Sequence, residues 1–135
     1  MIAFDTNALI RMLVEDDEDQ SKEVRNVVNF AENSSTKILI LPEVLIETVW
    51  VLEAVYKCSR KEISEFLDSL IETSIFTIAD LSVISSSIKQ YKKGGDFADM
   101  VIIGQAKNRK AKLFFSFDKK LKKTYPDFVI DRIKN

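Results

Sequence analysis

Short apolar runs alternate with longer segments along the chain. The runs are brief and continuous, as expected for buried strands, and the segments between them repeat apolar positions with helical spacing. The predicted strands are Met1–Phe4, Lys37–Leu41, Ile75–Ile78, Leu113–Ser116 and Phe128–Ile130. Continuous apolar strands separated by helices are typical of a parallel sheet covered on both faces. The pattern therefore predicts an α/β three-layer sandwich with a short parallel sheet of four or five strands flanked by helices.

Local signals mark where several of the helices begin and end. Ser59 and Glu62 form a capping-box pattern, and Gly94–Gly95 interrupts a helical segment. Asp80 and Asp96 can each cap the helix that follows. The predicted helices are Ala8–Val14, Ser21–Asn33, Glu43–Tyr56, Ser59–Ile71, a helix from Asp80 to about Tyr91, one from Asp96 to about Arg109, and a short basic helix from Asp118.

The composition fits one folded unit. The chain has 135 residues, of which 46% are apolar and 30% charged, as in ordinary globular proteins. A chain of this size can bury about two-thirds of the surface that its unfolded form exposes. With only three Gly and two Pro, no linker composition is present. We therefore expect a single domain over residues 1–135.

Residue usage narrows the chemistry and the compartment. The chain has no His, which excludes a Ser-His-Asp triad and a His-ligated zinc. Its lone Cys58 cannot form an intrachain disulfide, which favours a reducing compartment. No secretory leader pattern and no apolar run near the roughly 18 residues of a membrane span occur, so we expect a cytoplasmic protein. The net charge of −1 lacks the broad positive field of many nucleic-acid binders and leaves only local patches.

Acidic residues gather near the carboxyl ends of the predicted strands. They are Asp5 after the first strand, Glu43 and Glu47 on the helix after the second, Asp118 after the fourth, and Asp96 and Asp99 at the head of the helix before the fourth. Ligands bind outside the carboxyl ends of parallel strands, so we expect these acids on one edge of the sheet. Clustered carboxylates repel, and Mg²⁺ or Mn²⁺, which prefer oxygen ligands, relieve that repulsion. The cluster predicts a metal site suited to phosphodiester hydrolysis.

Most of these acids also have a purely structural interpretation. Asp5, Asp96 and Asp118 can be N-caps, and Glu43 and Asp99 lie where a helix dipole favours an acid. Each signal is weak alone, and their convergence on one sheet edge favours the metal site.

Glu47 and two hydroxyls add to that group. Glu47 lies between Ile46 and Thr48 in an apolar helix, where it is hard to explain as a solvated side chain. Thr6 and Ser116 can hold a metal-bound water or orient a carboxylate, and local capping is the equal alternative.

Four segments resemble the PIN-domain ribonucleases, and among them the VapC-type toxins of type II toxin–antitoxin pairs. They are MIAFDTNALIRMLVEDDEDQ, LPEVLIETVWVLEAVY, GGDFADMVIIGQAK and FFSFDKKLKK, in the family's order from residue 1 to about 123. The resemblance implies a PIN-like fold and an Mg²⁺- or Mn²⁺-dependent endoribonuclease. It also implies a homodimer and an antitoxin that masks the site, with Val44–Tyr56 and Ile63–Ile71 as candidate contact surfaces.

The resemblance assigns roles residue by residue. The catalytic and metal-holding acids would be Asp5, Asp99 and Asp118, with Glu47 directly or through water. The accessory residues would be Asp96, Thr6, Asn7 and Ser116. Metal-bound hydroxide would attack the phosphorus in line. The RNA backbone would be held by Arg11, Lys92, Lys93, Lys119 and Lys120, for which solvated surface is the alternative.

Three other readings of the sequence remain. A haloacid-dehalogenase-type phosphatase needs a second aspartate where Asn7 stands. A response-regulator receiver usually has an acidic pair before its first helix and a lysine after its last strand, and this sequence shows neither clearly. A PIN-like scaffold that binds RNA or protein without catalysis is the third alternative.

Overall fold

Five short strands and seven helices alternate along the part of the chain that the structure describes. The structure is a computed structural model and describes residues 1–133; residues 134–135 of the predicted domain lie outside it. The strands are β1 (Ile2–Ala3), β2 (Ile38–Ile40), β3 (Phe76–Ile78), β4 (Phe114–Phe115) and β5 (Val129–Ile130). The helices are α1 (Thr6–Leu13), α2 (Glu18–Ser34), α3 (Pro42–Ala54), α4 (Arg60–Glu72), α5 (Leu81–Lys92), α6 (Phe97–Asn108) and α7 (Lys119–Thr124). Across residues 1–133, no helix has both the length and the apolar character needed to cross a bilayer.

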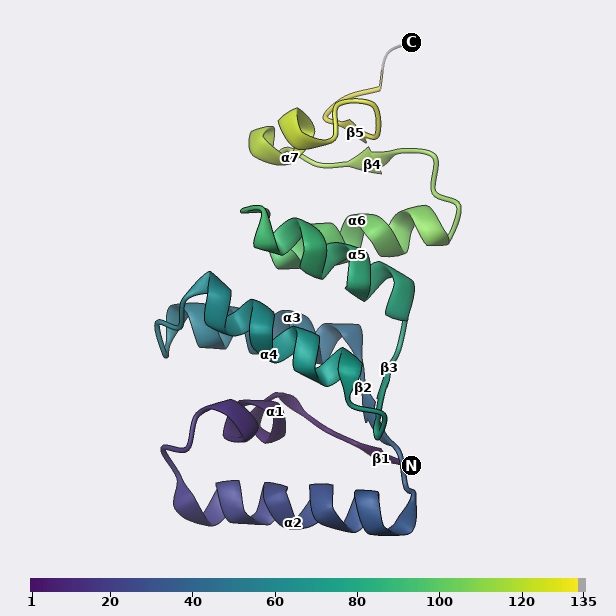
Figure 1. Cartoon of the computed structure of the whole chain (residues 1–135). Coiled ribbons are helices and arrows are strands. Elements are labelled where there is room, and N and C mark those ends of the chain that lie inside the picture. The colour runs from purple at the N-terminus through teal and green to yellow at the C-terminus, as the bar shows by residue number, and fades with distance from the viewer. Residues whose placement is uncertain (134–135) are drawn as a thin grey trace.

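The helices stack in successive tiers from the N-terminus to the C-terminus (Figure 1). Within the tiers α1 packs on α2, α3 on α4 and α5 on α6. Between the tiers α1 contacts α3, α3 contacts α6 and α4 contacts α5. The strands β1 to β3 lie at one end of the tiers, and α7 lies with β4 and β5 at the C-terminal end of the stack. Helices thus cover the sheets, as the alternating sequence pattern predicts.

The strands form two parallel sheets. One has the order β1-β2-β3, with Ile2 opposite Ile38 and Ile38 opposite Phe76, and the other pairs β4 with β5, with Phe114 opposite Val129. The predicted α/β class with parallel strands is confirmed. The strands are divided between two sheets instead of joined in one, because β1 and β4 do not pair and α5 and α6 lie between them. Ladders of two or three residues contribute few backbone bonds, so helix packing places each sheet.

The apolar core is divided as unequally as the sheets. A large cluster takes buried residues from α1 to α6 and from β2 and β3, with Leu9, Leu52 and Ile84 fully buried. A small cluster of Ile103, Leu121 and Val129 joins α7 and β5 to α6. Each fully buried aliphatic side chain stabilises the fold by about 1.5–3 kcal/mol. The C-terminal segment is therefore held by far less apolar burial than the rest of the chain.

Side-chain caps begin several helices as predicted. Ser59 and Glu62 make both bonds of the capping box, with Ser59 Oγ accepting from the Glu62 amide at 3.1 Å and Glu62 Oε1 from the Ser59 amide at 2.9 Å. Asp96 and Asp118 each accept a backbone amide of their own helix, at 2.9 and 3.0 Å.

The predicted side-chain cap at Asp80 is wrong. Asp80 holds the N-cap position of α5 with a left-handed backbone, φ 53°, and makes no capping bond. Its Oδ2 instead accepts from Gln105 Nε2 at 3.2 Å, which ties the start of α5 to α6. Aspartate tolerates the left-handed region better than most residues, so this geometry is accessible to it.

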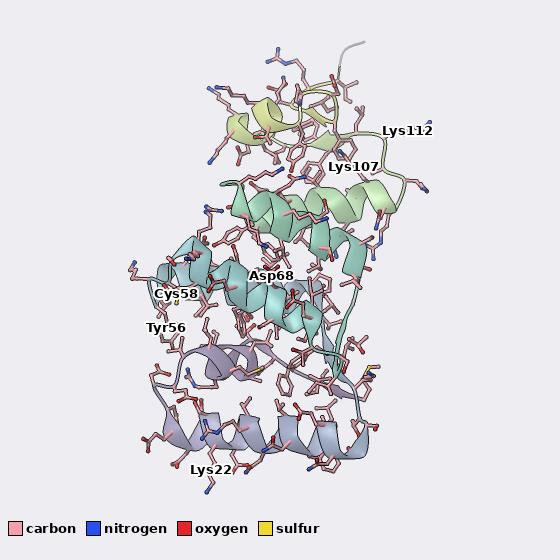
Figure 2. The ribbon with its side chains drawn as sticks, in the orientation of Figure 1. Lys22, Tyr56, Cys58, Asp68, Lys107 and Lys112 are labelled. Atoms are coloured by element: carbon pink, nitrogen blue, oxygen red, sulfur yellow. The ribbon has the colours of Figure 1, made fainter. Side chains whose placement is uncertain are left out.

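Cys58 has a structural setting. It lies half-buried with Tyr56 in the loop between α3 and α4 (Figure 2). Burial, followed by the charge of Glu62, raises the pKa of the Cys58 thiol. A thiol with a raised pKa is a poor nucleophile at neutral pH, because the thiolate is the reactive form.

Candidate active site

The first group of predicted site residues lies at the carboxyl ends of β1 and β2. Asp5 follows β1 and caps α1, with its Oδ1 accepting from the Ala8 amide at 3.0 Å. The buried Thr6 donates its hydroxyl to Oε1 of Glu47 on α3. Asp5 and Glu47 are both exposed. Because β1 and β2 are paired and parallel, the helices that follow them start side by side, and this brings the two acids to neighbouring helices.

The second group lies where α6 and α7 begin. Asp96 caps α6 and Asp118 caps α7, and in both only Oδ1 accepts a backbone amide. Ser116 Oγ accepts from the Asp118 amide at 3.0 Å, so this hydroxyl fixes the turn that presents Asp118. Asp99 sits on the first turn of α6, three residues after Asp96. The structural explanation therefore holds for Asp96 and Asp118, and it leaves one carboxylate oxygen of each for another partner.

Asp99 is the acid without a structural role in this group. It is half-buried, and within residues 1–133 its carboxylate has neither a hydrogen bond nor an ion pair. Burial raises the pKa of Asp99 most, the charges of Asp96 and Asp118 raise it further, and Lys120 lowers it. Environments that disfavour the charge of a cleft carboxylate are common at functional sites.

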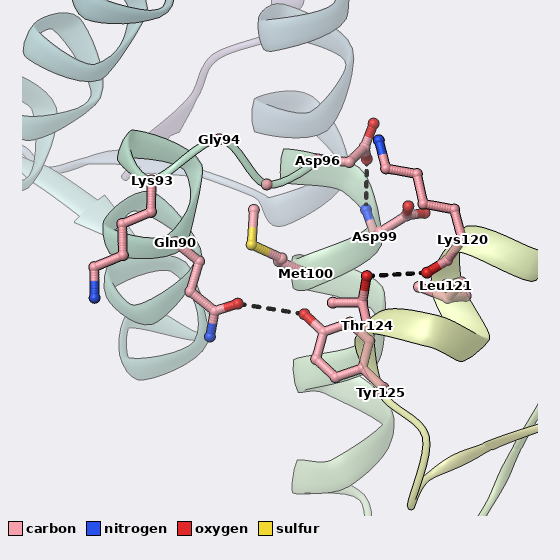
Figure 3. A pocket seen from close by; sticks show the side chains of 11 residues that line it. Gln90, Lys93, Gly94, Asp96, Asp99, Met100, Lys120, Leu121, Thr124 and Tyr125 are labelled. Atoms are coloured by element: carbon pink, nitrogen blue, oxygen red, sulfur yellow. Dashed lines mark hydrogen bonds between the residues drawn. The ribbon is translucent and has the colours of Figure 1, made fainter.

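A cavity of about 480 Å³ opens beside this second group. Asp96 and Asp99 line it from α6, Lys120 from α7 and Lys93 from the end of α5 (Figure 3). Tyr125, directly after α7, donates its hydroxyl to Gln90 Oε1 on α5 at 3.3 Å, and both residues also line the cavity. The cavity is thus lined by two aspartates and two lysines (Figure 3).

The two groups of acids do not merge. Within the described residues, no set of three or more acidic or thiol side chains converges where it could hold a metal ion. The rule that ligands gather at the carboxyl ends of strands applies to each sheet separately. Since β1 and β4 do not pair, Asp5 and Glu47 gather at one sheet while Asp118 joins Asp99 at the other. The expectation that all these acids share one sheet edge is corrected to two groups. The donors fit Mg²⁺ in kind, and within residues 1–133 they stand in two groups instead of one.

The predicted basic residues also divide. Arg11 forms an ion pair with Asp16 at 2.8 Å and also donates to Gln20 and Tyr56, so its guanidinium is held within the protein. Lys92 pairs with Asp68 at 2.6 Å on α4. Both residues make intramolecular contacts in the structure, and their contact with the RNA backbone stays a prediction. Lys93 and Lys120 line the cavity, Lys119 begins α7, and the predicted accessory residue Asn7 is exposed on α1.

Arg60 is a site-building residue that the sequence does not reveal. Its Nη1 donates to the carbonyls of Tyr91 and Gly95 at 2.8 and 2.7 Å, and its guanidinium carbon lies 4.2 Å from the centre of the Tyr91 ring. These contacts hold the turn at Gly94, whose φ of 106° suits glycine. This turn fixes the position of Asp96 and therefore the start of α6. A partner more than thirty residues away leaves no local sequence signal.

Comparisons with known proteins agree with the segments singled out in the sequence. A family model described as PIN domain matches residues 2–125. A curated VapC ribonuclease of Aquifex aeolicus is 31% identical over 127 residues, which cover 91% of each chain. No solved structure matches the chain significantly. The matched region contains both groups of acids.

Proposed function

Because the chain belongs to the PIN-domain family, we propose that it is an endoribonuclease that hydrolyses RNA phosphodiester bonds, with residues 1–135 forming one nuclease domain. The observation that carries the proposal is that Asp5, Glu47, Asp99 and Asp118 all occur in a chain 31% identical to a VapC ribonuclease. The chain has no His that could build a competing acid–base centre.

The proposed cofactor is Mg²⁺ or Mn²⁺. Carboxylate oxygens are the ligands that these ions prefer, and Asp5, Glu47, Asp99 and Asp118 supply them. Asp96 and Asp118 retain an oxygen that is not used for capping, and the carboxylate of Asp99 makes no hydrogen bond or ion pair in residues 1–133. Burial first, and then the charges of Asp96 and Asp118, raise the pKa of Asp99, and a divalent ion would offset both effects.

The remaining residues have positioning roles in this proposal. Thr6 orients Glu47 through its hydroxyl, and Ser116 orients the turn that carries Asp118. Lys93 and Lys120 neutralise a substrate phosphate in the cavity beside Asp99. Ammonium groups beside a scissile phosphate stabilise the charge that develops on its oxygens.

The biological setting is proposed from the same relative. A VapC-like chain would act as the toxin of a toxin–antitoxin pair in the cytoplasm, as a homodimer whose activity an antitoxin blocks. The apolar residue Trp50 is 62% exposed on α3 and is a candidate contact for either protein partner.

A cleavage assay tests the enzymatic proposal. Purified protein is incubated with total RNA and Mg²⁺ or Mn²⁺, with EDTA as the metal-free arm. We expect metal-dependent cleavage that is lost in Asp5→Asn and Glu47→Gln. The matched control is Glu43→Gln, an exposed acid one turn earlier on α3, which should cleave normally. Undiminished cleavage by Asp5→Asn would identify a contaminant.

The separation of the two acid groups favours one second candidate, a PIN-like module that binds RNA or protein without cleaving it. A thermal melt with and without millimolar Mn²⁺ distinguishes the two. The nuclease predicts a metal-dependent rise in melting temperature that weakens in Asp99→Asn. The binding module predicts no effect of the metal on the melting temperature.

A further inference from the structure

The outward face of strand β4 is apolar and uncovered. Leu113, Phe115 and Phe117 alternate with Phe114 and Ser116, as expected for an extended segment in which successive side chains face opposite ways. The three are 51%, 55% and 79% exposed, whereas Phe114 packs on Phe128 in the small apolar cluster. Phe115 and Phe117 form an edge-to-face pair with ring centres 5.1 Å apart. Two aromatic rings therefore lie exposed on the surface in edge-to-face contact.

This aromatic pair lies within the most basic part of the chain. Residues 107–123 contain eight Lys or Arg and one acid, Asp118, although the whole chain has a net charge of −1. Lys122 pairs with Asp131, and Lys107 lies over the rings of Tyr125 and Phe128. Lys112 extends outward from the loop before β4 (Figure 2). The other cations of the segment make no ion pair within residues 1–133. They are Arg109, Lys110, Lys112, Lys119, Lys120 and Lys123.

The pair is also directly connected to the candidate active site. Phe117 precedes Asp118, and Lys120 reaches from the first turn of α7 into the cavity that Asp96 and Asp99 line. A nucleotide whose phosphate lies at Lys120 would have its base or its neighbour's base within reach of the β4 face. A sheet face that carries aromatics between cations is a known means of binding single-stranded nucleic acid, because every base has a face that can stack.

We propose that Phe117, supported by Phe115, is a base-stacking subsite that selects unpaired nucleotides of an RNA substrate next to the active site. The inference rests on the proposed nuclease function and deepens it by naming the aromatic residues that would contact the bases. Bases inside a duplex are stacked on one another and cannot lie flat against a protein ring. Lys119 and Lys120 hold the adjoining phosphates without sequence preference.

Charge argues against a second copy of the chain as the occupant of this face. A symmetric dimer through β4 would place the basic segments of both protomers against each other, and like charges at an interface oppose association. A polyanion gains from the same cations. An acidic protein segment shares the charge and lacks flat bases, so the aromatic requirement separates it from RNA.

Binding is measured without cleavage, so that the result does not depend on the nuclease proposal. Full-length protein in EDTA is titrated with a fluorescent oligouridylate, which is unstacked, and with the same strand annealed to oligoadenylate. We expect Phe117→Leu to weaken oligouridylate binding about tenfold and to leave duplex binding unchanged. The matched control is Phe30→Leu, a phenylalanine 58% exposed on α2, which should bind like the wild type.

Two further variants sharpen the result. In a Trp50→Phe background, Phe117→Trp should retain binding and its fluorescence should be quenched by oligouridylate. Lys119→Ala should weaken the binding of single-stranded RNA of any sequence. It should also reduce the slope of log affinity against log salt by about 0.7.

Defined outcomes would overturn the proposal. They are binding by Phe117→Leu within twofold of the wild type, duplex bound as tightly as single strand, no detectable binding by the wild type, or full competition by polyglutamate. Cleavage lost in Asp5→Asn together with unaltered binding by Phe117→Leu would retain the nuclease and reject the stacking subsite. Stacking-dependent binding without cleavage would retain the subsite and reject the nuclease.

Discussion

The two groups of acids are built on different supports. Asp5 and Glu47 stand on α1 and α3, which pack in the large apolar cluster, and a buried threonine joins them across 41 residues of sequence. Asp99 and Asp118 meet where α7 rests on a cluster of three buried residues. The first group is therefore held by tertiary packing. In the second group α6 packs in the same large cluster, whereas Asp118, at the start of α7, depends on a local cap and a small contact area. The comparison teaches that one half of the candidate site can move or unfold more readily than the other.

Removing a leucine from each cluster should give the largest effects and test this difference. Leu52→Ala in the large cluster is expected to cost about 3 kcal/mol of global stability, because it leaves a cavity at a fully buried position. Leu121→Ala should cost about 2 kcal/mol or less and act mainly on α7 and β5. Urea denaturation gives the free energies of unfolding, and amide hydrogen exchange locates the loss. Equal, global loss of protection in both variants would show that the two clusters unfold as one unit.

Replacing Thr6 by valine should break the link within the first group. The change keeps the side-chain shape and removes the hydroxyl that donates a hydrogen bond to Glu47. We expect a loss of about 1 kcal/mol, since Glu47 is exposed and water replaces part of the bond, together with reduced cleavage. Thr48→Val is the control: this fully buried threonine bonds only to the Val44 carbonyl of its own helix, at 2.7 Å. Similar cleavage by both variants would rule out an orienting role for Thr6.

Arg60→Lys should loosen the second group without touching its acids. Lysine cannot span both carbonyls and stack on Tyr91 as the guanidinium does. The expected loss in the free energy of unfolding is below about 1 kcal/mol, because Arg60 is exposed. Faster amide exchange at the start of α6 would locate the change, and Lys61→Ala, the next exposed residue, should show none. A loss of stability without local exchange at α6 would contradict the clamp.

Asp99→Asn should give the smallest effect and one that depends on pH. A raised carboxylate pKa in the folded state means that the folded protein binds this proton more readily than the unfolded chain. The charged form of Asp99 therefore destabilises the fold above its folded-state pKa, and this cost disappears as the pH falls through that value. At neutral pH the variant should be more stable by less than about 0.5 kcal/mol, since Asp99 is partly exposed and the helix dipole favours its charge.

The measurement for Asp99→Asn is the difference in melting temperature from the wild type at low salt, taken at neutral and acidic pH. The difference should shrink on acidification. Asp127→Asn, an exposed aspartate before β5, serves as the matched control. A difference that grows as the pH falls would contradict the raised pKa.

Local features of the fold could be predicted from the sequence, and pairings between distant segments could not. The capping box at Ser59 and the caps at Asp96 and Asp118 follow from residue types within one turn of chain. The predicted side-chain cap at Asp80 does not form, because Asp80 instead accepts a hydrogen bond from Gln105, and that bond depends on how α5 packs on α6. Periodicity identified each strand to within a few residues, and it does not state which strands pair.

The candidate site shows the same limit. Asp5, Asp99 and Asp118 could be found because they follow a strand or lie at the start of a helix, and Glu47 because it interrupts an apolar helix. Their order in the chain also resembles a family. Their division into two groups could not be predicted, since it follows from the separation of β1 and β4. The ion pairs of Arg11 and Lys92 likewise depend on contacts with Asp16 and Asp68 that no spacing encodes.

The basic segment at residues 107–123 gives the chain an asymmetric distribution of charge. Its net charge is +7, which leaves −8 on the rest of the chain. The basic segment therefore attracts anions, and the rest of the chain repels them. A diffusing polyanion would be turned during approach, so that encounters with the acidic surface are brief and encounters with the basic end are prolonged. Collisions would then be productive more often than random orientation allows. Salt screens this long-range attraction. Raising the ionic strength should therefore lower the association rate strongly and change the dissociation rate little.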